Sequence, residues 1–253
     1  MGKTIANTAR ALIGLDKFHF SVMYLDHQDL LVYGDMISVP ETIELNVNTN
    51  SQASVLFADN KPAIAYTTIG VVEVSMTKAT LPNEFLAILL GNRKVGGVRH
   101  ITSDQNSPYV GIAWRQLYSD GSYAYVKLFK GKFMEPENNS RTKEDGVEFQ
   151  TREIMANFIA TSFQETDDNS EKFSLLMATT DETDPNYTDE GLTWFDSIIA
   201  PMYTAWVTAT SYDVNDAVSS GGNIYRCIAA HTAGATFATD STKWELLGAA
   251  PTA

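Results

Sequence analysis

Apolar and polar positions alternate along much of the chain before residue 165, the pattern of strands with one buried face. The clearest case lies in residues 109–161, where two aromatic-rich runs flank Asp120-Gly121. This dipeptide favours the tight turn of a β-hairpin because both residues tolerate a positive φ. A polar loop that contains Pro136 follows, and a third long run covers residues 147–161. The pattern predicts a hairpin followed by another strand.

Earlier runs show the same alternation and predict strands at residues 18–24, 42–47, 53–58 and 72–77. In the second of these runs, Ile43, Leu45 and Val47 are expected to share one face. In the last run, the valines and Met76 point one way and the polar residues the other. Residues 1 to about 17 are weakly patterned and are expected to form an arm that is loosely held outside an assembly.

The period of the pattern changes in residues 81–92. Pro82 stands near the start of this segment and Gly91 near its end, an asymmetry typical of helix termini. Apolar residues cover most of the expected helix circumference, so we predict a short helix buried against a sheet. Many strands with one helix predict a mainly β protein, a β sandwich or barrel with a flanking α-helix.

The composition changes after residue 164. Residues 165–190 hold nine acidic residues and one basic residue, Lys172, which predicts a solvated loop region around a short apolar piece, residues 173–177. Residues 194–200 are expected to form a last short element of the first domain, and Pro201 marks a boundary. We therefore divide the chain into a first domain, residues 1–201, and a small C-terminal β module, residues 202–253.

The C-terminal module has few aliphatic residues and widely spaced aromatic ones, so its core must be built from rings. Trp206, Tyr225 and Trp244 are expected to form that core. Tyr212 and Phe237 stand beside turn-like segments and are the better candidates for exposed rings, which would stack on sugar faces. We therefore name Tyr212 and Phe237 as the candidate carbohydrate-binding residues.

Charge and cysteine content narrow the function further. The 253 residues carry a formal net charge of −13, which disfavours tight nucleic-acid binding but suits a surface along which DNA slides without adhering. Cys227 is the only cysteine, which excludes an intrachain disulfide and a cysteine-based metal cluster. The sequence has no run of about 18 apolar residues and no recognisable signal peptide, so we expect no membrane span and synthesis in a cytoplasm.

Motifs of catalysis are missing from the sequence. It contains no phosphate loop, no GxGxxG and no GxSxG, and its four histidines are scattered. Residues 26–29 suit a polar turn better than a metal site, and residues 181–185 suit a solvated acidic loop better than a calcium site. We therefore expect no catalytic residues, no metal, no cofactor and no enzymatic activity. A glycosidase that uses two carboxylates stays as a third alternative behind a structural protein and a carbohydrate-binding adhesin.

Several short segments, taken in order, resemble a known family. They read GLDKFHF at residues 14–20, FADN at 57–60, LPNEF at 81–85, LLG at 89–91, KLFKGKF at 127–133 and RTKEDGVEFQT at 141–151. Together, residues from about 14 to about 161 resemble the major tail protein, or tail-tube protein, of long-tailed phages that infect Gram-positive bacteria.

The C-terminal module resembles a chitin-binding-type carbohydrate-binding module. The matching segments are AW at residues 205–206, Tyr212, NDAV at 215–218, GNIYRC at 222–227 and KWELL at 243–247. Asn215 stands where the usual pattern has a glycine before Asp216.

These resemblances imply a structural virion protein that assembles as stacked hexameric rings into the tail tube, the conduit for genome ejection. The implied partners are copies of the chain itself, tape-measure and tail-terminator proteins, and DNA that passes without specific binding. The arm and a loop, either residues 59–67 or 135–146, would contact neighbouring subunits. The module would decorate the outside of the tube and offer a contact to host-surface glycans. The alternative is a carbohydrate-binding adhesin or receptor-binding tail component.

Overall fold

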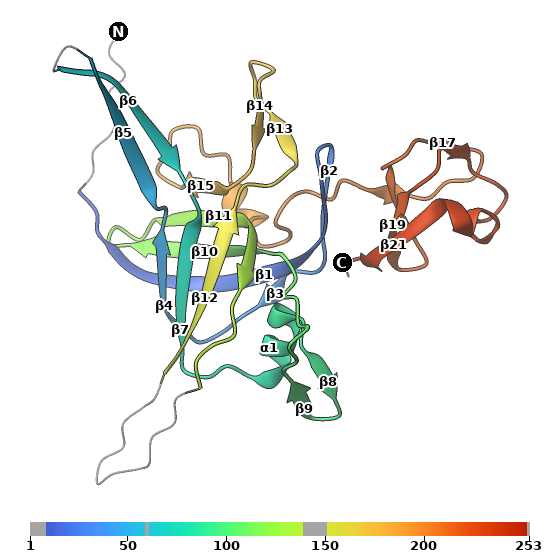
Figure 1. The fold of residues 1–253 in the computed structure, drawn as a ribbon, viewed down its shortest axis with the longest axis horizontal. Helices are drawn as coiled ribbons and strands as arrows, with labels where there is room; N and C mark the ends of the chain where they lie inside the picture. Colours follow the sequence, from blue (N-terminus) through green and yellow to red (C-terminus); the bar gives the residue numbers. More distant parts are fainter. Residues whose placement is uncertain (1–8, 59–60, 139–150, 252–253) are drawn as a thin grey trace.

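The structure, a computed structural model, describes residues 9–58, 61–138 and 151–251. These residues form a mainly β body that carries one α-helix, followed by a small β module (Figure 1). The predicted fold class is therefore confirmed. We call the part up to Pro201 the body and the part after it the module.

One sheet of nine strands builds the body, in the order β2-β1-β10-β11-β12-β7-β4, with β3 joined to β1 and β15 joined to β11. Its strands are β1 (Leu12–His27), β2 (Leu30–Tyr33), β3 (Ile37–Ser38), β4 (Thr42–Asn48), β7 (Val72–Lys78), β10 (Val110–Tyr118), β11 (Tyr123–Phe133), β12 (Arg152–Ile159) and β15 (Met177–Asp181).

Three two-stranded hairpins stand apart from this sheet. They pair β5 (Ser51–Ala58) with β6 (Lys61–Ile69), β8 (Arg93–Val95) with β9 (Val98–His100), and β13 (Gln164–Thr166) with β14 (Lys172–Ser174). The helix α1 (Asn83–Leu90) precedes β8, and a short 3-10 helix, η1 (Glu190–Leu192), follows β15. Figure 1 shows the β5–β6 hairpin projecting from the upper side of the body and the β8–β9 hairpin on its lower side.

Strand β11 bends the sheet into two layers. Its first half pairs with β10 and β15, whereas Lys130–Phe133 pair with β12. One extra residue of β11 lies between Leu128 and Gly131 opposite β10, which is a β-bulge, and a bulge bends a strand and increases its twist. A Cβ at Gly131 would lie 2.5 Å from the Phe158 ring, so only glycine leaves room for that ring. In Figure 1, β4, β7 and β12 accordingly cross β1 and β10 as a second layer of a sandwich.

The main core fills the space between these layers and is mostly aliphatic. Alternation in β7 buries Val72, Val74 and Met76, as predicted. The predicted helix is also confirmed, and its buried residues, Leu86, Leu89 and Leu90, join the same core. It ends at Gly91, whose φ of 66° is the left-handed conformation that glycine adopts without strain.

Several predictions at the level of single elements are wrong. The expected face of residues 42–47 is broken by a register shift between Thr42 and Glu44, which leaves Ile43 54% exposed while Leu45 and Val47 pack on the core. Residues 12–16, which were expected to belong to the arm, pair with β10 as the start of β1, and residues 1–8 lie outside the described part. The Asp120-Gly121 hairpin is confirmed as β10–β11, and residues 152–159 of the third run form β12.

The expected loops also differ. Most of residues 59–67 belong to β6 rather than to a loop, with residues 59–60 outside the described part. Residues 135–138 have no regular structure, and 139–146 are not described. The acidic segment 165–190 contains most of β13 together with β14 and β15, because its polar residues suit exposed strands and turns. Residues 194–200 form no strand, yet Trp194, Phe195 and Ile198 pack on a second, smaller core beneath β10 and β11.

The module contains a sheet in the order β16-β18-β19-β21 and a pair, β17-β20. Its elements are β16 (Thr204–Ala205), β17 (Ser211–Tyr212), β18 (Ala217–Ser220), β19 (Asn223–Cys227), β20 (His231–Thr232), the 3-10 helix η2 (Phe237–Lys243) and β21 (Trp244–Ala249).

An apolar contact joins the module to the body. Leu30 and Val32 of β2 pack with Ala217 and Ile224 of the module. The Tyr24 ring lies between two glycines, because an added Cβ would come within 2.5 Å of Tyr24 at Gly34 and within 2.7 Å at Gly248. The module therefore rests on the β1–β2 hairpin through a close-fitting contact that has no room for larger side chains at either glycine.

Candidate functional site

The module is built around a chain of touching rings. Phe237 lies at its centre, with ring centroids 4.5 Å from Tyr225, 5.6 Å from Trp244 and 5.9 Å from Trp206. Trp244 also meets Tyr212 edge to face at 5.1 Å. The prediction that Trp206, Tyr225 and Trp244 form the core is confirmed, because Trp244 is buried and the other two rings pack partly buried against it.

The two candidate sugar-binding residues do not lie on an open surface. Tyr212 is only 6% exposed, and its hydroxyl accepts a hydrogen bond from Val207 N at 2.8 Å. The expectation that this ring is exposed is therefore wrong, because the hydroxyl finds a backbone partner inside the module. Phe237 is partly buried by the three rings around it. Its part in sugar binding stays a prediction.

The exposed apolar residues of the module are aliphatic rather than aromatic. They are Val207, Val214, Ile228 and Leu246. Among residues 202–251, which the structure describes, no aromatic side chain is largely exposed. A flat ring platform of the kind that stacks on a sugar face is thus not formed by the described residues.

The structure explains how Asn215 replaces the expected glycine. Its φ is 81°, a conformation in which glycine is unstrained and asparagine is among the best-tolerated alternatives. Asn215 N donates to Cys227 O at 2.8 Å, and the Asp216 carboxylate accepts from Asp213 N at 2.7 Å. The departure from the usual pattern therefore leaves this turn intact.

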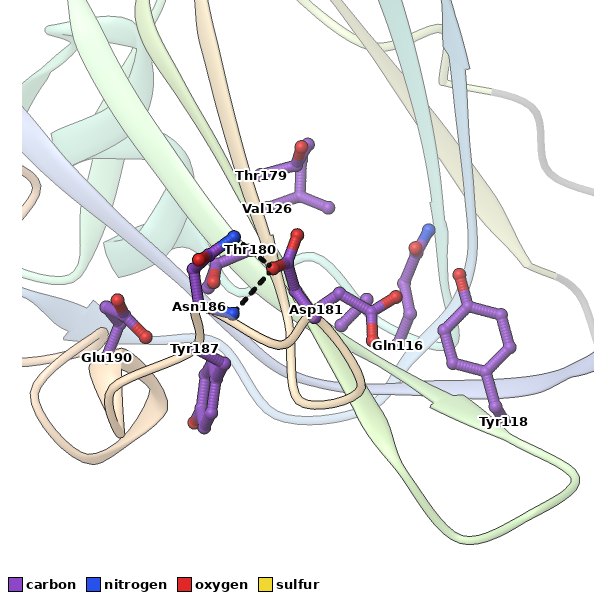
Figure 2. Close-up of a pocket in the computed structure, with 11 residues that line it drawn as sticks. Gln116, Tyr118, Val126, Thr179, Thr180, Asp181, Asn186, Tyr187 and Glu190 are labelled. Atoms are coloured by element: carbon purple, nitrogen blue, oxygen red, sulfur yellow. Dashed lines mark hydrogen bonds between the residues drawn. The ribbon is translucent and has the colours of Figure 1, made fainter. Parts of the chain in front are cut away.

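A separate depression of about 500 Å³ lies in the body beside β10, β11 and β15 (Figure 2). Its polar lining includes three carboxylates, and each already accepts hydrogen bonds from its surroundings. Asp181 pairs with Arg10, Asp184 accepts from Asn186 N at 2.8 Å, and Glu190 accepts from Thr188 N at 2.9 Å. The hydrogen bond from Arg10 lowers the pKa of Asp181, so that carboxyl stays ionised and is a poor proton donor. The depression therefore resembles structured surface more than a catalytic cleft.

Residues 26–29 and 181–185 are the two acidic segments considered as metal sites. In each of them an aspartate accepts hydrogen bonds from other groups of the protein. Burial favours a raised pKa for Asp26, but hydrogen bonds from Lys130 Nζ, Ser162 N and Phe163 N outweigh it and lower the pKa. In residues 181–185, Asp181 accepts from Arg10 and from Thr183 N. Within the described ranges, no group of three or more His, Cys, Asp or Glu side chains is placed to hold a metal ion. No helix in those ranges is long and apolar enough to cross a membrane.

Sequence reasoning missed two features of the body. Lys127 is buried under Trp194, and burial lowers its pKa to about 8, although Asp196 acts in the opposite direction. The β8–β9 hairpin exposes apolar residues at its tip. A signal for the hairpin was present, because Gly96-Gly97 stands between two valines in an alternating run. No comparable signal marks Lys127 as buried.

Comparison with protein-family models matches residues 205–245 to carbohydrate-binding module family 5/12. No match to the chain is found among curated proteins. The family match falls wholly within the module described above. The module is therefore similar to carbohydrate-binding modules, and this similarity suggests glycan binding by this part of the chain.

Proposed function

We propose that the chain is a structural virion protein whose body assembles as stacked hexameric rings into a phage tail tube, with the module on the outside. The observation that carries the proposal is a β sandwich with unpaired strand edges and projecting hairpins. Within the described residues, β4 pairs only with β7 and β15 only with β11. Open edges of this kind favour pairing with another chain, and closing a ring removes them.

The placement of the family-like segments supports this proposal. Residues 14–20 lie in β1, α1 contains parts of the segments 81–85 and 89–91, and residues 127–133 lie in β11, so four of the six segments lie wholly or partly in the sandwich or its flanking helix. Residues 57–58 end β5, and residues 59–60 and 141–150 lie outside the described part.

The charge of the chain suits a tube through which DNA passes. A net charge of −13 repels phosphates and disfavours adhesion of DNA to the protein. Tape-measure and tail-terminator proteins would complete the assembly, and the protein would be made in the host cytoplasm and function in the virion without catalysis. Electron microscopy of the purified full chain tests the proposal. Rings or tubes with a hole wide enough for duplex DNA are expected, and persistent monomers at high concentration would contradict it.

A second role, glycan binding by the module, is favoured by the family match at residues 205–245. We propose that the module contacts host-surface glycans while it decorates the tube. Because the described rings pack against one another, any stacking contact would use the partly buried Phe237 and its neighbours Trp206 and Tyr225. An adhesin or receptor-binding role for the whole protein is the corresponding alternative.

Retention of the full chain on insoluble chitin and on Gram-positive cell walls tests this second role. Phe237→Ala is expected to reduce retention about two- to twelvefold if its ring stacks on a sugar, since stacking contacts of aromatic rings are worth about 0.5–1.5 kcal/mol beyond the area that they bury. Tyr212→Phe is the matched control, because it keeps the ring and removes only a hydroxyl that faces Val207. If Phe237→Ala binds as well as wild type, the prediction that Phe237 binds sugar is wrong. If the wild-type chain binds none of these glycans, the glycan-binding role itself is contradicted.

A further inference from the structure

The β8–β9 hairpin presents a mixed apolar and cationic face to solvent. Arg93 pairs with His100 and Val95 pairs with Val98 across its two strands. Because side chains alternate along a strand, these four residues share one face. Val95 is 68% exposed and Val98 57%, and Ile101, just beyond the hairpin, is 60% exposed. Such a group of exposed aliphatic residues is typical of a contact surface.

The hairpin is anchored at its base and clear of the body at its tip. Arg99, on the opposite face, donates to Asn92 Oδ1 at 2.6 Å and to both carboxylate oxygens of Glu135, at 2.7 and 2.9 Å. At the turn, no atom lies within 4 Å of a Cβ placed on Gly96 or Gly97. The apolar tip is therefore held in a fixed direction and is not covered by the described part of the chain.

The β13–β14 hairpin has the complementary chemistry. Glu165 and Phe173 form a cross-strand pair on one face, and Phe173 is 45% exposed. Asp168 and Glu171 stand at the turn, where Asp167 accepts from Asn169 N and Glu171 N and so fixes its shape. This hairpin thus offers an exposed ring beside Glu165, with Lys172 on the opposite face, whereas β8–β9 offers exposed valines beside Arg93.

The two hairpins lie on opposite sides of the molecule. Figure 1 shows β13 and β14 on the upper side and β8 and β9 on the lower side. Surfaces that match in charge and in apolar content but lie far apart cannot meet within one chain. They can meet between copies that repeat in the same orientation, which is a heterologous contact.

We propose that the β8–β9 hairpin of one copy binds the β13–β14 hairpin of the next copy along the assembly. Phe173 packs on Val95 and Val98, while Glu165 and Glu171 face Arg93, which shares that face of the hairpin. Arg93 is largely exposed, and its ion pair within the described residues is a distant one, with Asp104 at 3.9 Å. The inference rests on the proposed self-assembly and names one surface that mediates it.

A pair of charge-reversed variants tests this contact. Arg93→Glu places acid opposite acid, and Glu165→Lys/Glu171→Lys places base opposite base. Each variant alone is expected to need at least about a tenfold higher concentration than wild type for half-assembly, since like charges across a contact repel. An equimolar mixture of the two is expected to regain assembly, because copies that alternate satisfy both contacts.

Sedimentation velocity over a concentration series, with electron microscopy of the same samples, measures the result. Val95→Ser/Val98→Ser tests the apolar part of the contact, the packing of Phe173 on the two valines. Val207→Ser, which replaces an exposed valine of the module, is its matched control. Charge-reversed variants that assemble like wild type, or a mixture that does not regain assembly, would overturn the hairpin contact. The proposed function would still stand in that case if the wild-type protein forms tubes. Wild-type protein that never assembles would overturn both. The wild-type chain could also bind duplex DNA or anionic vesicles. If Val95→Ser/Val98→Ser loses that binding while assembly is unchanged, the hairpin contacts those partners and the proposed contact between copies is wrong.

Discussion

The body and the module form their hydrophobic cores from different kinds of side chain. The body packs aliphatic side chains from two layers of one bent sheet, and its largest cluster includes Val74, Leu89 and Ile112. The module, about 50 residues long, has too few aliphatic residues for this and closes its core with Trp244, Tyr212 and their neighbours. The consequence is functional, because a sugar that stacks on the module would have to use rings that also hold its core together.

The apolar residues left exposed differ in the same way. In the body, Val95, Val98, Tyr66 and Phe173 stand on hairpins that project from the sandwich. In the module, the exposed apolar residues are scattered aliphatic ones. This difference is the reason for proposing that the body mediates assembly and that any glycan contact of the module depends on partly buried rings.

The largest effect is expected from truncating the core of the body. Phe158→Ala removes a fully buried ring that meets Phe133 edge to face at 6.3 Å and covers Gly131. We expect the free energy of unfolding to fall by about 3–5 kcal/mol, measured by chemical denaturation. Ile159→Ala, on the opposite face of β12, is the control and should change it by about 0.5 kcal/mol or less. Equal effects of the two substitutions would contradict the two-layer core.

A smaller effect is expected where β1, β11 and the segment after β12 meet. Asp26→Asn weakens the ion pair with Lys130 and the charge-assisted hydrogen bonds from Ser162 N and Phe163 N, at a cost of about 1.5–3 kcal/mol. The pKa of Asp26 is lowered in the folded state, so its contribution is complete above the ordinary carboxyl pKa of about 3.9 and is lost as the pH falls through the folded-state value.

Denaturation of wild type and Asp26→Asn over a pH series checks this linkage. The wild-type chain should lose more stability on acidification than the variant, so that the difference between them narrows below about pH 4. A difference that stays constant with pH would show that the charge of Asp26 contributes nothing.

A further loss of stability is expected from a substitution at the contact between the body and the module. Gly248→Ala would place a Cβ within 2.7 Å of the Tyr24 ring, and we expect a loss of about 1–3 kcal/mol through overpacking. Limited proteolysis should then cut the linker near Pro201 faster, because the module is less firmly held. Gly14→Ala is the control, since no atom lies within 4 Å of its added Cβ. Unchanged proteolysis in Gly248→Ala would contradict the close-fitting contact.

The smallest effect is expected inside the module. Tyr212→Phe removes the hydroxyl that accepts from Val207 N at 2.8 Å and should lower the melting temperature in line with a loss of about 0.5–1.5 kcal/mol. Retention on glycans should not change, because this hydroxyl faces the interior. A variant with full stability but weaker glycan retention would return Tyr212 to the sugar-binding surface.

The sequence could predict those parts of the body whose pattern follows from local geometry. Period-two alternation in Val72–Lys78 and the Pro82–Gly91 asymmetry depend on neighbours along the chain, and both predictions are confirmed. The turn at Asp120-Gly121 is equally local, with Gly121 at a φ of 86°.

The remaining features depend on how the chain folds rather than on the pattern of neighbouring positions. Strand β15 carries a weak pattern, because it is an edge strand whose side chains are partly or largely exposed, so the sequence predicts a loop there. The bulge beside Ile43 follows from the pairing of β4 with β7. Tyr212 is polar at its tip and lies near a turn, and only the fold brings Val207 within reach of its hydroxyl.

Cryo-electron microscopy of the purified full chain at high concentration tests the central claim most directly. The account predicts tubes of stacked closed rings, in which the bodies form the wall around a hole wide enough for duplex DNA and the modules project outward. Monomers at every concentration, or assemblies held together through the modules with the bodies apart, would contradict it.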